Sequence, residues 1–201
     1  MKALFFGGAF NPPSIAHIGV AYEAMKGIGF DRVVFVPSKS HYIQAYQKKN
    51  LLFSEEERYS LLNKIAATHP WMMVSRIEID QKDQPRTYDT MKKLAPQFEE
   101  LKLLMGSDKL GELETGWKHI DEIGREFGFV CMTRNFDDTE KIFLENPYLH
   151  QRRDYFVLLP SNDKYQCISS TRIRERIEKQ ESLKGFVPDE IRAEVEKKER
   201  S

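Results

Sequence analysis

Residues 3–17 read ALFFGGAFNPPSIAH, and this stretch decides the fold. Ala3–Phe6 is a short apolar run, which predicts a buried strand. Ile15–Met25 has the apolar spacing of a helix. Gly7-Gly8 lies between them and allows a tight turn and close approach of a ligand to the backbone. The stretch therefore predicts a strand, a loop and a helix in immediate succession.

The start of that helix is a candidate anion site. Asn11-Pro12-Pro13 is a turn signal, and Ser14 follows where the N-cap of a helix is expected. His17 lies one turn further along, on the same face as Ser14. Free N–H groups and the positive end of the helix dipole favour a phosphate at such a place. The competing interpretation is an ordinary capped helix with a structural histidine.

The rest of the chain alternates apolar runs with amphipathic stretches. Further strands are predicted at Arg32–Val36, Met72–Ile79, Leu101–Met105, Phe129–Thr133 and Tyr155–Leu159. Helices are predicted at Glu55–Thr68, Thr87–Leu94, Trp117–Glu126, Thr139–Leu144, Ser170–Lys179 and Asp189–Lys198, with a loop over Ser38–Asn50. This alternation predicts an α/β fold, a Rossmann-like doubly wound parallel sheet with helices on both faces. We expect a single domain over residues 1–201, with a small helical C-terminal annex from about 168 to 201.

The composition narrows the choice of partners. Lys+Arg and Asp+Glu both number 31, so the formal net charge is zero and no bulk attraction to nucleic acid is expected. No apolar run approaches transmembrane length and no signal peptide is recognised, so neither a membrane nor export is expected and a cytoplasmic location is the default. The sequence leaves the oligomeric state open, a homo-oligomer included.

A second candidate phosphate motif lies near the C-terminus. Ile168–Arg174 reads ISSTRIR and follows a predicted strand. Ser169, Ser170 and Thr171 put three consecutive hydroxyl groups at a helix start, and Arg174 lies on its first turn. An amphipathic helix with a good cap and surface arginines is the alternative.

Both motifs resemble the signatures of the nucleotidyltransferase superfamily. The first family signature is Gly-Gly-Thr-Phe-Asp/Asn-Pro-x-His/Thr-x-Gly-His, and the second is Ile-Ser-Ser-Thr-x-Ile/Val-Arg. The first is matched at Gly7, Gly8, Phe10, Asn11, Pro12 and His17, and the second is matched throughout. Ala9, Ser14 and Ala16 depart from the first, although Ser14 keeps the hydroxyl of the Thr variant.

The middle of the chain resembles the nicotinate and nicotinamide mononucleotide adenylyltransferases. Thr87–Met91 (TYDTM) is similar to their Thr-x-Asp-Thr-Leu, and Gly106-Ser107-Asp108 with Trp117-Lys118 is similar to their Gly-Ala-Asp…Trp-Lys. Arg134 follows a predicted strand, at the position where the family has an Arg at the end of a strand. The resemblance implies a mononucleotide site at Thr87, Gly106, Asp108, Trp117 and Arg134. From the residues alone, Asp108 could equally cap a helix and Trp117 could equally be a packing residue.

The loop after the second predicted strand resembles eukaryotic members. Residues 46–51 read YQKKNL, similar to Tyr-Lys-Lys-Lys-Gly-Leu. The resemblance implies that Lys48 or Lys49 binds phosphate, and a solvated basic loop is the alternative. Arg58 matches the Arg that opens the family's next helix.

The resemblance implies an adenylyltransferase of NAD biosynthesis. It would join ATP to nicotinate or nicotinamide mononucleotide and release pyrophosphate. Catalytic roles fall on His17, Ser14 and Arg174. ATP or phosphate binding falls on Gly7, Gly8, Phe10, Asn11, Lys48, Lys49, Ser169, Ser170 and Thr171. Mg²⁺ is expected to be carried with ATP, with no dedicated metal site on the protein.

Two other functions stay open. Ser14 at the Thr position favours another nucleotidyltransferase, such as the pantetheine-phosphate adenylyltransferase. The departures at Ala9, Ser14 and Ala16 favour a nucleotide-binding sensor without turnover. The sequence does not choose between a nicotinate and a nicotinamide acceptor, which differ by one carboxylate against one amide.

Overall fold

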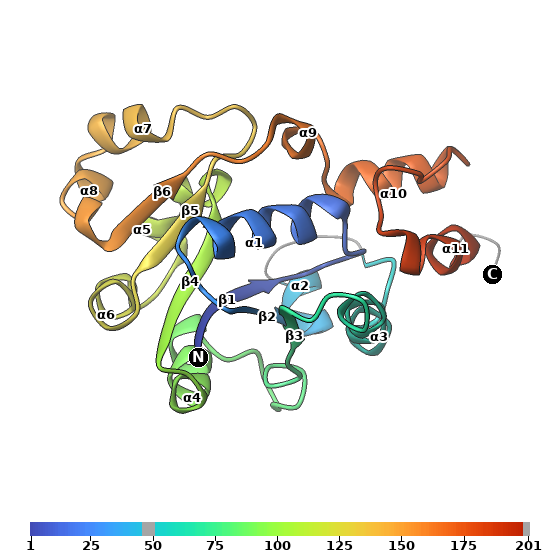
Figure 1. Cartoon of the computed structure of the whole chain (residues 1–201), viewed down its shortest axis with the longest axis horizontal. Coiled ribbons are helices and arrows are strands. Elements are labelled where there is room, and N and C mark those ends of the chain that lie inside the picture. The colour runs from blue at the N-terminus through green and yellow to red at the C-terminus, as the bar shows by residue number, and fades with distance from the viewer. Residues whose placement is uncertain (46–50, 199–201) are drawn as a thin grey trace. The chain divides into compact units, whose positions relative to one another are not determined.

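The computed structural model describes residues 1–45 and 51–198. Its strands form one sheet in the order β3-β2-β1-β4-β5-β6 (Figure 1). The strands are β1 (Lys2–Gly8), β2 (Arg32–Pro37), β3 (Met72–Val74), β4 (Glu100–Gly106), β5 (Phe129–Met132) and β6 (Phe156–Leu159). The pairs β1–β4, β4–β5 and β5–β6 are parallel. The predicted α/β, Rossmann-like fold class is confirmed.

Helices separate the strands along the chain. The α-helices are α1 (Ile15–Gly27), α2 (Ser40–Ala45), α3 (Glu55–Ala66), α4 (Thr87–Leu94), α5 (Leu113–Gly116), α6 (Ile120–Glu126), α7 (Thr139–Glu145), α8 (Pro147–His150), α9 (Asp163–Gln166), α10 (Ser170–Glu178) and α11 (Asp189–Lys197). Short 3-10 helices are η1 (Ala95–Gln97), η2 (Ser107–Glu112) and η3 (Arg153–Tyr155).

The chain divides into two compact units, each assembled from three separate stretches. The first unit comprises residues 1–6, 20–33 and 86–166, and the second comprises residues 7–19, 34–85 and 167–201. Both predicted phosphate motifs fall in the second unit. The predicted mononucleotide residues fall in the first.

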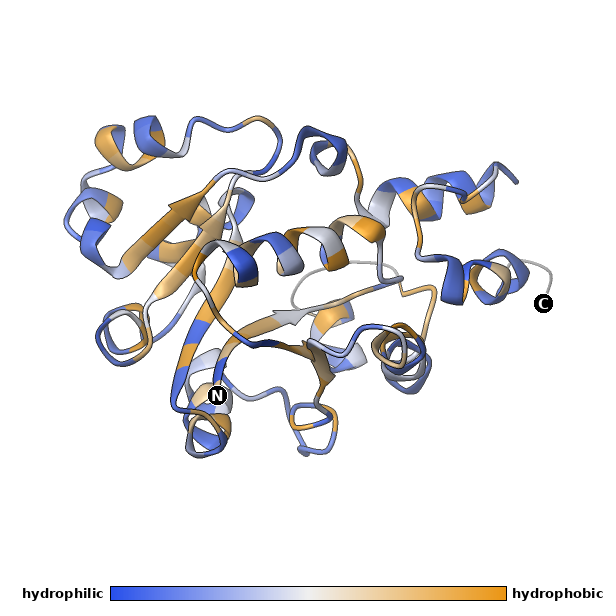
Figure 2. Ribbon diagram, in the orientation of Figure 1, coloured by the Kyte–Doolittle hydropathy of each residue, from blue (hydrophilic) through white to orange (hydrophobic). Residues whose placement is uncertain are grey.

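The first unit is built on the apolar strands β4, β5 and β6 (Figure 2). Phe129 of β5 pairs with Phe156 of β6, and their rings stack with centroids 4.4 Å apart. Both side chains are buried, and such a pair contributes about 0.5–1.5 kcal/mol beyond its burial. This packing stabilises the strands whose carboxyl ends carry the pair Gly106 and Met132, in β4 and β5 respectively.

In the second unit, α3 begins as the sequence predicts. The Ser54 side chain accepts from the Glu57 N–H while the Glu57 carboxylate accepts from the Ser54 N–H, a complete capping box. The buried face of α3 carries Leu61, Leu62 and Ile65. Because its apolar spacing and its cap agree, this helix is among the elements that sequence reasoning placed well.

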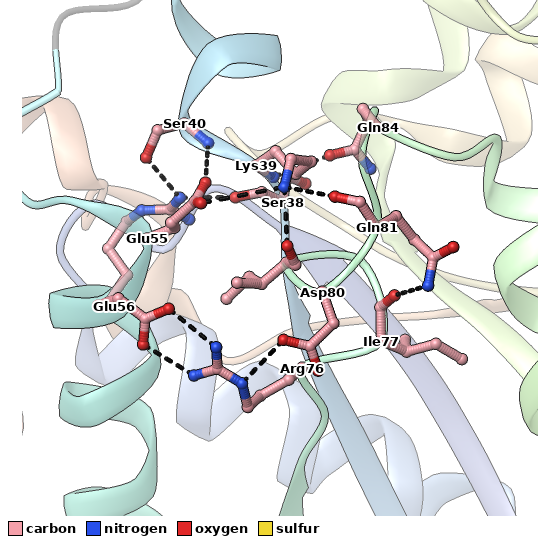
Figure 3. A network of polar contacts seen from close by, with 12 residues as sticks. Ser38, Lys39, Ser40, Glu55, Glu56, Arg76, Ile77, Asp80, Gln81 and Gln84 are labelled. Carbon is pink, nitrogen blue, oxygen red and sulfur yellow. Dashed lines mark hydrogen bonds and ion pairs between the residues drawn. The ribbon is translucent and has the colours of Figure 1, made fainter.

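The predicted strand Met72–Ile79 is wrong beyond Val74. β3 ends there, and the chain continues through turns to residue 85. Lys39, directly after β2, donates from Nζ to the carbonyl oxygens of Ile79 and Gln81, both at 2.7 Å (Figure 3). These carbonyl oxygens accept hydrogen bonds from a lysine and not from a neighbouring strand. The apolar pattern alone could not show this, so it predicted a strand that is too long.

Two other boundaries differ from the predictions. The loop predicted over Ser38–Asn50 contains the helix α2, whose Ile43 is fully buried. The helix predicted from Trp117 begins only at Ile120, because His119 adopts a left-handed backbone conformation with φ 63°. Trp117 itself is extended, with φ −103° and ψ 148°.

Candidate functional site

Ser14 and His17 form a closed hydrogen-bonded turn at the start of α1. The Ser14 hydroxyl oxygen lies 2.7 Å from Nδ1 of His17, and the Ser14 N–H donates to the same nitrogen at 3.1 Å. The His17 N–H donates back to the Ser14 hydroxyl at 3.2 Å, so Ser14 is the predicted N-cap. A backbone N–H can only donate, so Nδ1 must accept. The neutral ring therefore carries its proton on Nε2.

The helix start differs from the expected row of free N–H groups. The Ile15 N–H donates to the Phe186 carbonyl oxygen at 3.0 Å, and those of Ser14 and His17 are engaged in the turn just described. Ser14 is also fully buried, whereas His17 is half-buried. The sequence pattern identified the cap but not these occupied donors. Three backbone donors are thus engaged, which gives the side chains, His17 first among them, a larger part in any contact with a phosphate here.

The turn in the first motif does not occur at its glycines. Gly7 and Gly8 continue β1, and the left-handed residue is Phe10, with φ 47°. A Cβ atom on Gly8 would lie 3.2 Å from the Phe10 ring. The Phe10 ring in turn meets the His17 ring edge-on, with centroids 5.2 Å apart. The absence of a side chain at Gly8 therefore makes room for the Phe10 ring, which packs against the His17 ring.

The structure brings the two phosphate motifs together. Arg174 donates from Nη1 to the Asn11 carbonyl oxygen at 2.9 Å, and the Ser170 hydroxyl donates to the Pro12 carbonyl oxygen at 2.8 Å. Arg174 also donates from Nη2 to the Thr171 hydroxyl at 3.1 Å. Burial lowers the pKa of the Arg174 guanidinium from its ordinary value. Hydrogen bonds from Arg174 and Ser170 thus join the two motifs.

Ser169 has the capping role in the second motif. Its hydroxyl accepts from the Arg172 N–H at 3.2 Å, at the start of α10. The Asn11 side chain has an equally structural position, since its Oδ1 accepts from the N–H groups of Leu52 and Phe53 at 3.2 and 3.0 Å. Asn11 is 2% exposed. It holds the first motif to the chain that enters α3.

Arg58 is a structural anchor of the site whose role sequence reasoning missed. It is fully buried, and it donates to the carbonyl oxygens of Ala9 at 2.7 Å and Ser38 at 2.6 Å. Burial lowers the pKa of its guanidinium to about 10. It stays charged near neutral pH and ties the first motif to the end of β2. The signal in the sequence was the helical spacing that places Arg58 on the same face as Leu61, Leu62 and Ile65.

Most of the Lys39 side chain is buried, and like Arg58 it is an anchor that binds backbone carbonyl oxygens. Besides its two carbonyl partners, it lies 3.9 Å from the Glu55 carboxylate, and its own N–H donates to Gln84 at 2.8 Å. Gln84 donates in turn to the buried Glu78 carboxylate at 2.6 Å. This network fixes the chain after β3 (Figure 3). The predicted phosphate ligands Lys48 and Lys49 lie outside the described residues.

In the first unit, three of the predicted mononucleotide residues lie together. Asp108 Oδ1 is 3.8 Å from Arg134 Nε, at the carboxyl ends of β4 and β5. A Cβ atom on Gly106 would lie 2.4 Å from Asp108 Oδ1 and 3.1 Å from Arg134 Cδ. The absence of a side chain at Gly106 is what lets the carboxylate and the guanidinium approach one another here.

The other two mononucleotide residues lie on different elements of the same unit. Thr87 is the first residue of α4, and Trp117 lies between α5 and α6; both are half-buried. Sequence reasoning missed Asp137, whose carboxylate accepts from the Ser107 hydroxyl at 2.7 Å. The same hydroxyl accepts from the Arg134 N–H at 2.8 Å. Ser107 and Asp137 thus set the backbone from which Arg134 extends.

Within residues 1–45 and 51–198, no group of three or more His, Cys, Asp or Glu side chains is placed to hold a metal ion. No helix among them is sufficiently long and apolar to cross a membrane.

Comparison with known proteins gives the class. The chain belongs to the cytidylyltransferase-like family, whose model matches residues 5–176. Within that class it is 32% identical to the probable nicotinate-nucleotide adenylyltransferase of Clostridium perfringens (strain 13 / Type A), over 91% of this chain and 89% of the relative. It is 28% identical to the protein of the same name from Fusobacterium nucleatum, over 98% of each chain.

Solved structures agree on the fold. The structure of Plasmodium falciparum nicotinic acid mononucleotide adenylyltransferase complexed with NaAD matches with a TM-score of 0.73, covering 98% of this chain and 94% of that one at 15% identity. The same enzyme complexed with APC matches with a TM-score of 0.69. At this identity the likeness concerns the arrangement of the backbone.

Proposed function

We propose that this protein joins ATP to nicotinate or nicotinamide mononucleotide and releases pyrophosphate, a step of NAD biosynthesis. The observation that carries the proposal is the hydrogen bond by which Arg174 of the second phosphate motif contacts the Asn11 carbonyl oxygen of the first motif, which also contains His17. The relatives named probable nicotinate-nucleotide adenylyltransferase support it. Their name favours the nicotinate form of the acceptor.

The reaction forms one bond and breaks one. An oxygen of the acceptor's 5′-phosphate attacks the α-phosphorus of ATP, and the bond from that phosphorus to the pyrophosphate oxygen breaks. A phosphate monoester has its second pKa at about 6, so the nucleophile is anionic at neutral pH and needs no general base. Catalysis then comes from positioning and from charge stabilisation.

The side chains of the second unit supply these effects. His17 donates its Nε2–H to the oxygens around the α-phosphorus, where negative charge builds up. Arg174 and the Thr171 hydroxyl hold the rest of the triphosphate. The Ser170 hydroxyl donates its proton to the Pro12 carbonyl oxygen and so joins the two motifs. Ser14 is buried, so its part is to hold His17 and not to contact the phosphate.

Mg²⁺ enters with ATP in this proposal. Phosphate oxygens are hard ligands that suit Mg²⁺, and the ion would neutralise part of the triphosphate charge. Cations and hydroxyl groups of the protein then complete the neutralisation. In the first unit, Asp108 and Arg134, together with Trp117 and Thr87 from other elements, are proposed to take the mononucleotide.

One assay tests the reaction. Purified protein is given ATP and Mg²⁺ with each pyridine mononucleotide, or with pantetheine phosphate, and pyrophosphate release is followed. Release with a pyridine mononucleotide alone is expected. Release only with pantetheine phosphate supports the related adenylyltransferase, and ATP binding with no release supports a sensor.

The variant His17→Ala tests the mechanism. Loss of one donor to developing charge costs about 10²–10³ in turnover in comparable sites. The control is His150→Ala, since His150 is exposed at the end of α8 in the other unit. Near-normal turnover in His17→Ala, with both variants folded by circular dichroism, would overturn the role of His17.

A further inference from the structure

Phe136 is exposed and adopts an unfavourable backbone conformation. Its side chain is 63% exposed and its φ is 59°. Asn135 has φ 54°, and the Asp137 N–H donates to the Arg134 carbonyl oxygen at 2.9 Å, which closes a four-residue turn. Two central residues at positive φ define a turn of type I′, which prefers Asn followed by Gly. Asn135 fits this preference, and Phe136 stands where Gly would be the default.

The turn is held in this conformation by polar partners in the same unit. The Phe136 N–H donates to Gln166 Oε1 at 3.1 Å. Gln166 is 5% exposed, and its Nε2 donates to the Ser161 hydroxyl at 2.8 Å. Ser107 binds the other side of the turn, through the Arg134 N–H and the Asp137 carboxylate. Strain that is fixed in this way by its surroundings is concentrated at functional sites.

The place of the turn fits ligand binding. It follows the carboxyl end of β5, where Met132 pairs with Gly106 of β4. Ligands of parallel sheets bind beyond the carboxyl ends of the strands. Arg134 opens the turn and pairs with Asp108. The turn therefore belongs to the cluster proposed to take the mononucleotide.

We infer that the Phe136 ring stacks against the pyridine ring of the acceptor mononucleotide. This inference rests on the proposed function and adds a residue that neither family motif contains. An exposed aromatic face suits a flat heterocycle, since stacking tolerates different ring chemistries and needs no hydrogen bond. The pyridine ring and not the adenine is chosen because Phe136 shares its turn with Arg134.

The test separates the ring from the backbone strain. Phe136→Gly removes the ring and relieves the positive φ, whereas Phe136→Tyr keeps both. Leu144→Ala is the control, because Leu144 is a 71% exposed apolar side chain on α7. The KM for the mononucleotide, the KM for ATP and the Tm are measured for each variant and for the wild type.

Function and stability are expected to move in opposite directions in Phe136→Gly. The KM for the mononucleotide should rise about tenfold, as for the loss of one stacked base, while the KM for ATP stays within about twofold. The Tm should rise by about 2 °C or more as the strain is relieved. Phe136→Tyr and Leu144→Ala should keep both KM values near those of the wild type.

Three results would overturn the inference. They are an unchanged mononucleotide KM in Phe136→Gly, a rise confined to the KM for ATP, and a clear fall in Tm, which would mean that the ring packs for stability. Wild-type protein that turns over neither mononucleotide overturns the proposed function, and the inference with it. Normal wild-type turnover with an unaffected Phe136→Gly overturns the inference alone.

Discussion

The Ser14 hydroxyl oxygen lies 2.7 Å from Nδ1 of His17, and Ser14 is fully buried. The position at which family members place His or Thr therefore contacts, in this chain, the histidine that we propose to be catalytic. The Ser14 N–H donates to the same Nδ1, so two groups of one residue leave the ring proton on Nε2. This arrangement makes Ser14 a positioning residue.

Ser14→Ala is expected to lower turnover about fivefold, because a hydrogen bond contributes about 1 kcal/mol and about 1.4 kcal/mol changes a rate tenfold. The ¹⁵N resonances of His17 should show a less uniform Nε2–H form. Ser54→Ala is the matched control, since Ser54 caps α3 in the same way without contact to His17. Equal turnover in both variants would contradict the positioning role.

Arg58→Met is expected to reduce the free energy of unfolding by about 2–4 kcal/mol. It leaves the buried carbonyl oxygens of Ala9 and Ser38 without their donor, at about 1–3 kcal/mol each, while the cost of burying a charge disappears. Urea unfolding measures this. Arg172→Met is the control, because Arg172 is exposed and, among the hydrogen bonds described, its side chain donates only to the Cys167 carbonyl oxygen. A loss equal to the control's would show that Arg58 is no anchor.

Gly106→Ala should raise the KM for the mononucleotide several-fold and change stability by less than about 1 kcal/mol. The added Cβ meets the end of the mobile Asp108 side chain at 2.4 Å, so the carboxylate moves and its pairing with Arg134 is lost while the backbone stays. Gly111→Ala has no atom within 4 Å of its new Cβ and is the control. An unchanged KM would remove Gly106 and Asp108 from the proposed site.

Stability should depend on pH through Glu57. Burial raises the pKa of this carboxyl, but Lys198 and the Ser54 cap outweigh it and lower the pKa below its ordinary value. The unfolded chain then binds more protons in the acid range, so the stabilisation is present above about pH 4.3 and is lost as the pH falls through the lowered pKa.

Glu57→Gln should therefore be less stable than the wild type at pH 7 by up to about 1 kcal/mol, because the pair is partly screened by solvent. At pH 3 the difference should shrink. Urea unfolding at both pH values measures it, with the exposed Glu145→Gln as control. A difference that stays constant with pH would refute the assignment to Glu57.

The sequence predicted the elements whose pattern and end signals agree. The span of α4 matches the prediction at both ends, and α3 begins where its capping box places it. The predicted strand after Val74 failed because partners far along the chain, such as Lys39, take its carbonyl groups. The hydropathy pattern of a segment does not show its hydrogen bonds to residues far away in the sequence.

The sequence did not predict the internal hydrogen bonds of the proposed site. Motif resemblance placed Arg174 and Asn11 in one site, and the structure adds that the bond runs to a carbonyl oxygen. Whether a hydroxyl such as that of Ser14 faces a ligand or a neighbour depends on rotamer and burial. These follow from tertiary packing, which single-sequence patterns do not encode.

The interleaving of the two units bears on the order in which the protein matures. A chain leaves the ribosome from its N-terminus, and all stretches of the first unit have been synthesised by residue 166. The second unit receives its last stretch, with Arg174, only afterwards. A nascent or prematurely terminated chain that lacks this stretch has no Arg174 to bind the Asn11 carbonyl oxygen, so the proposed competence to capture ATP would be acquired last.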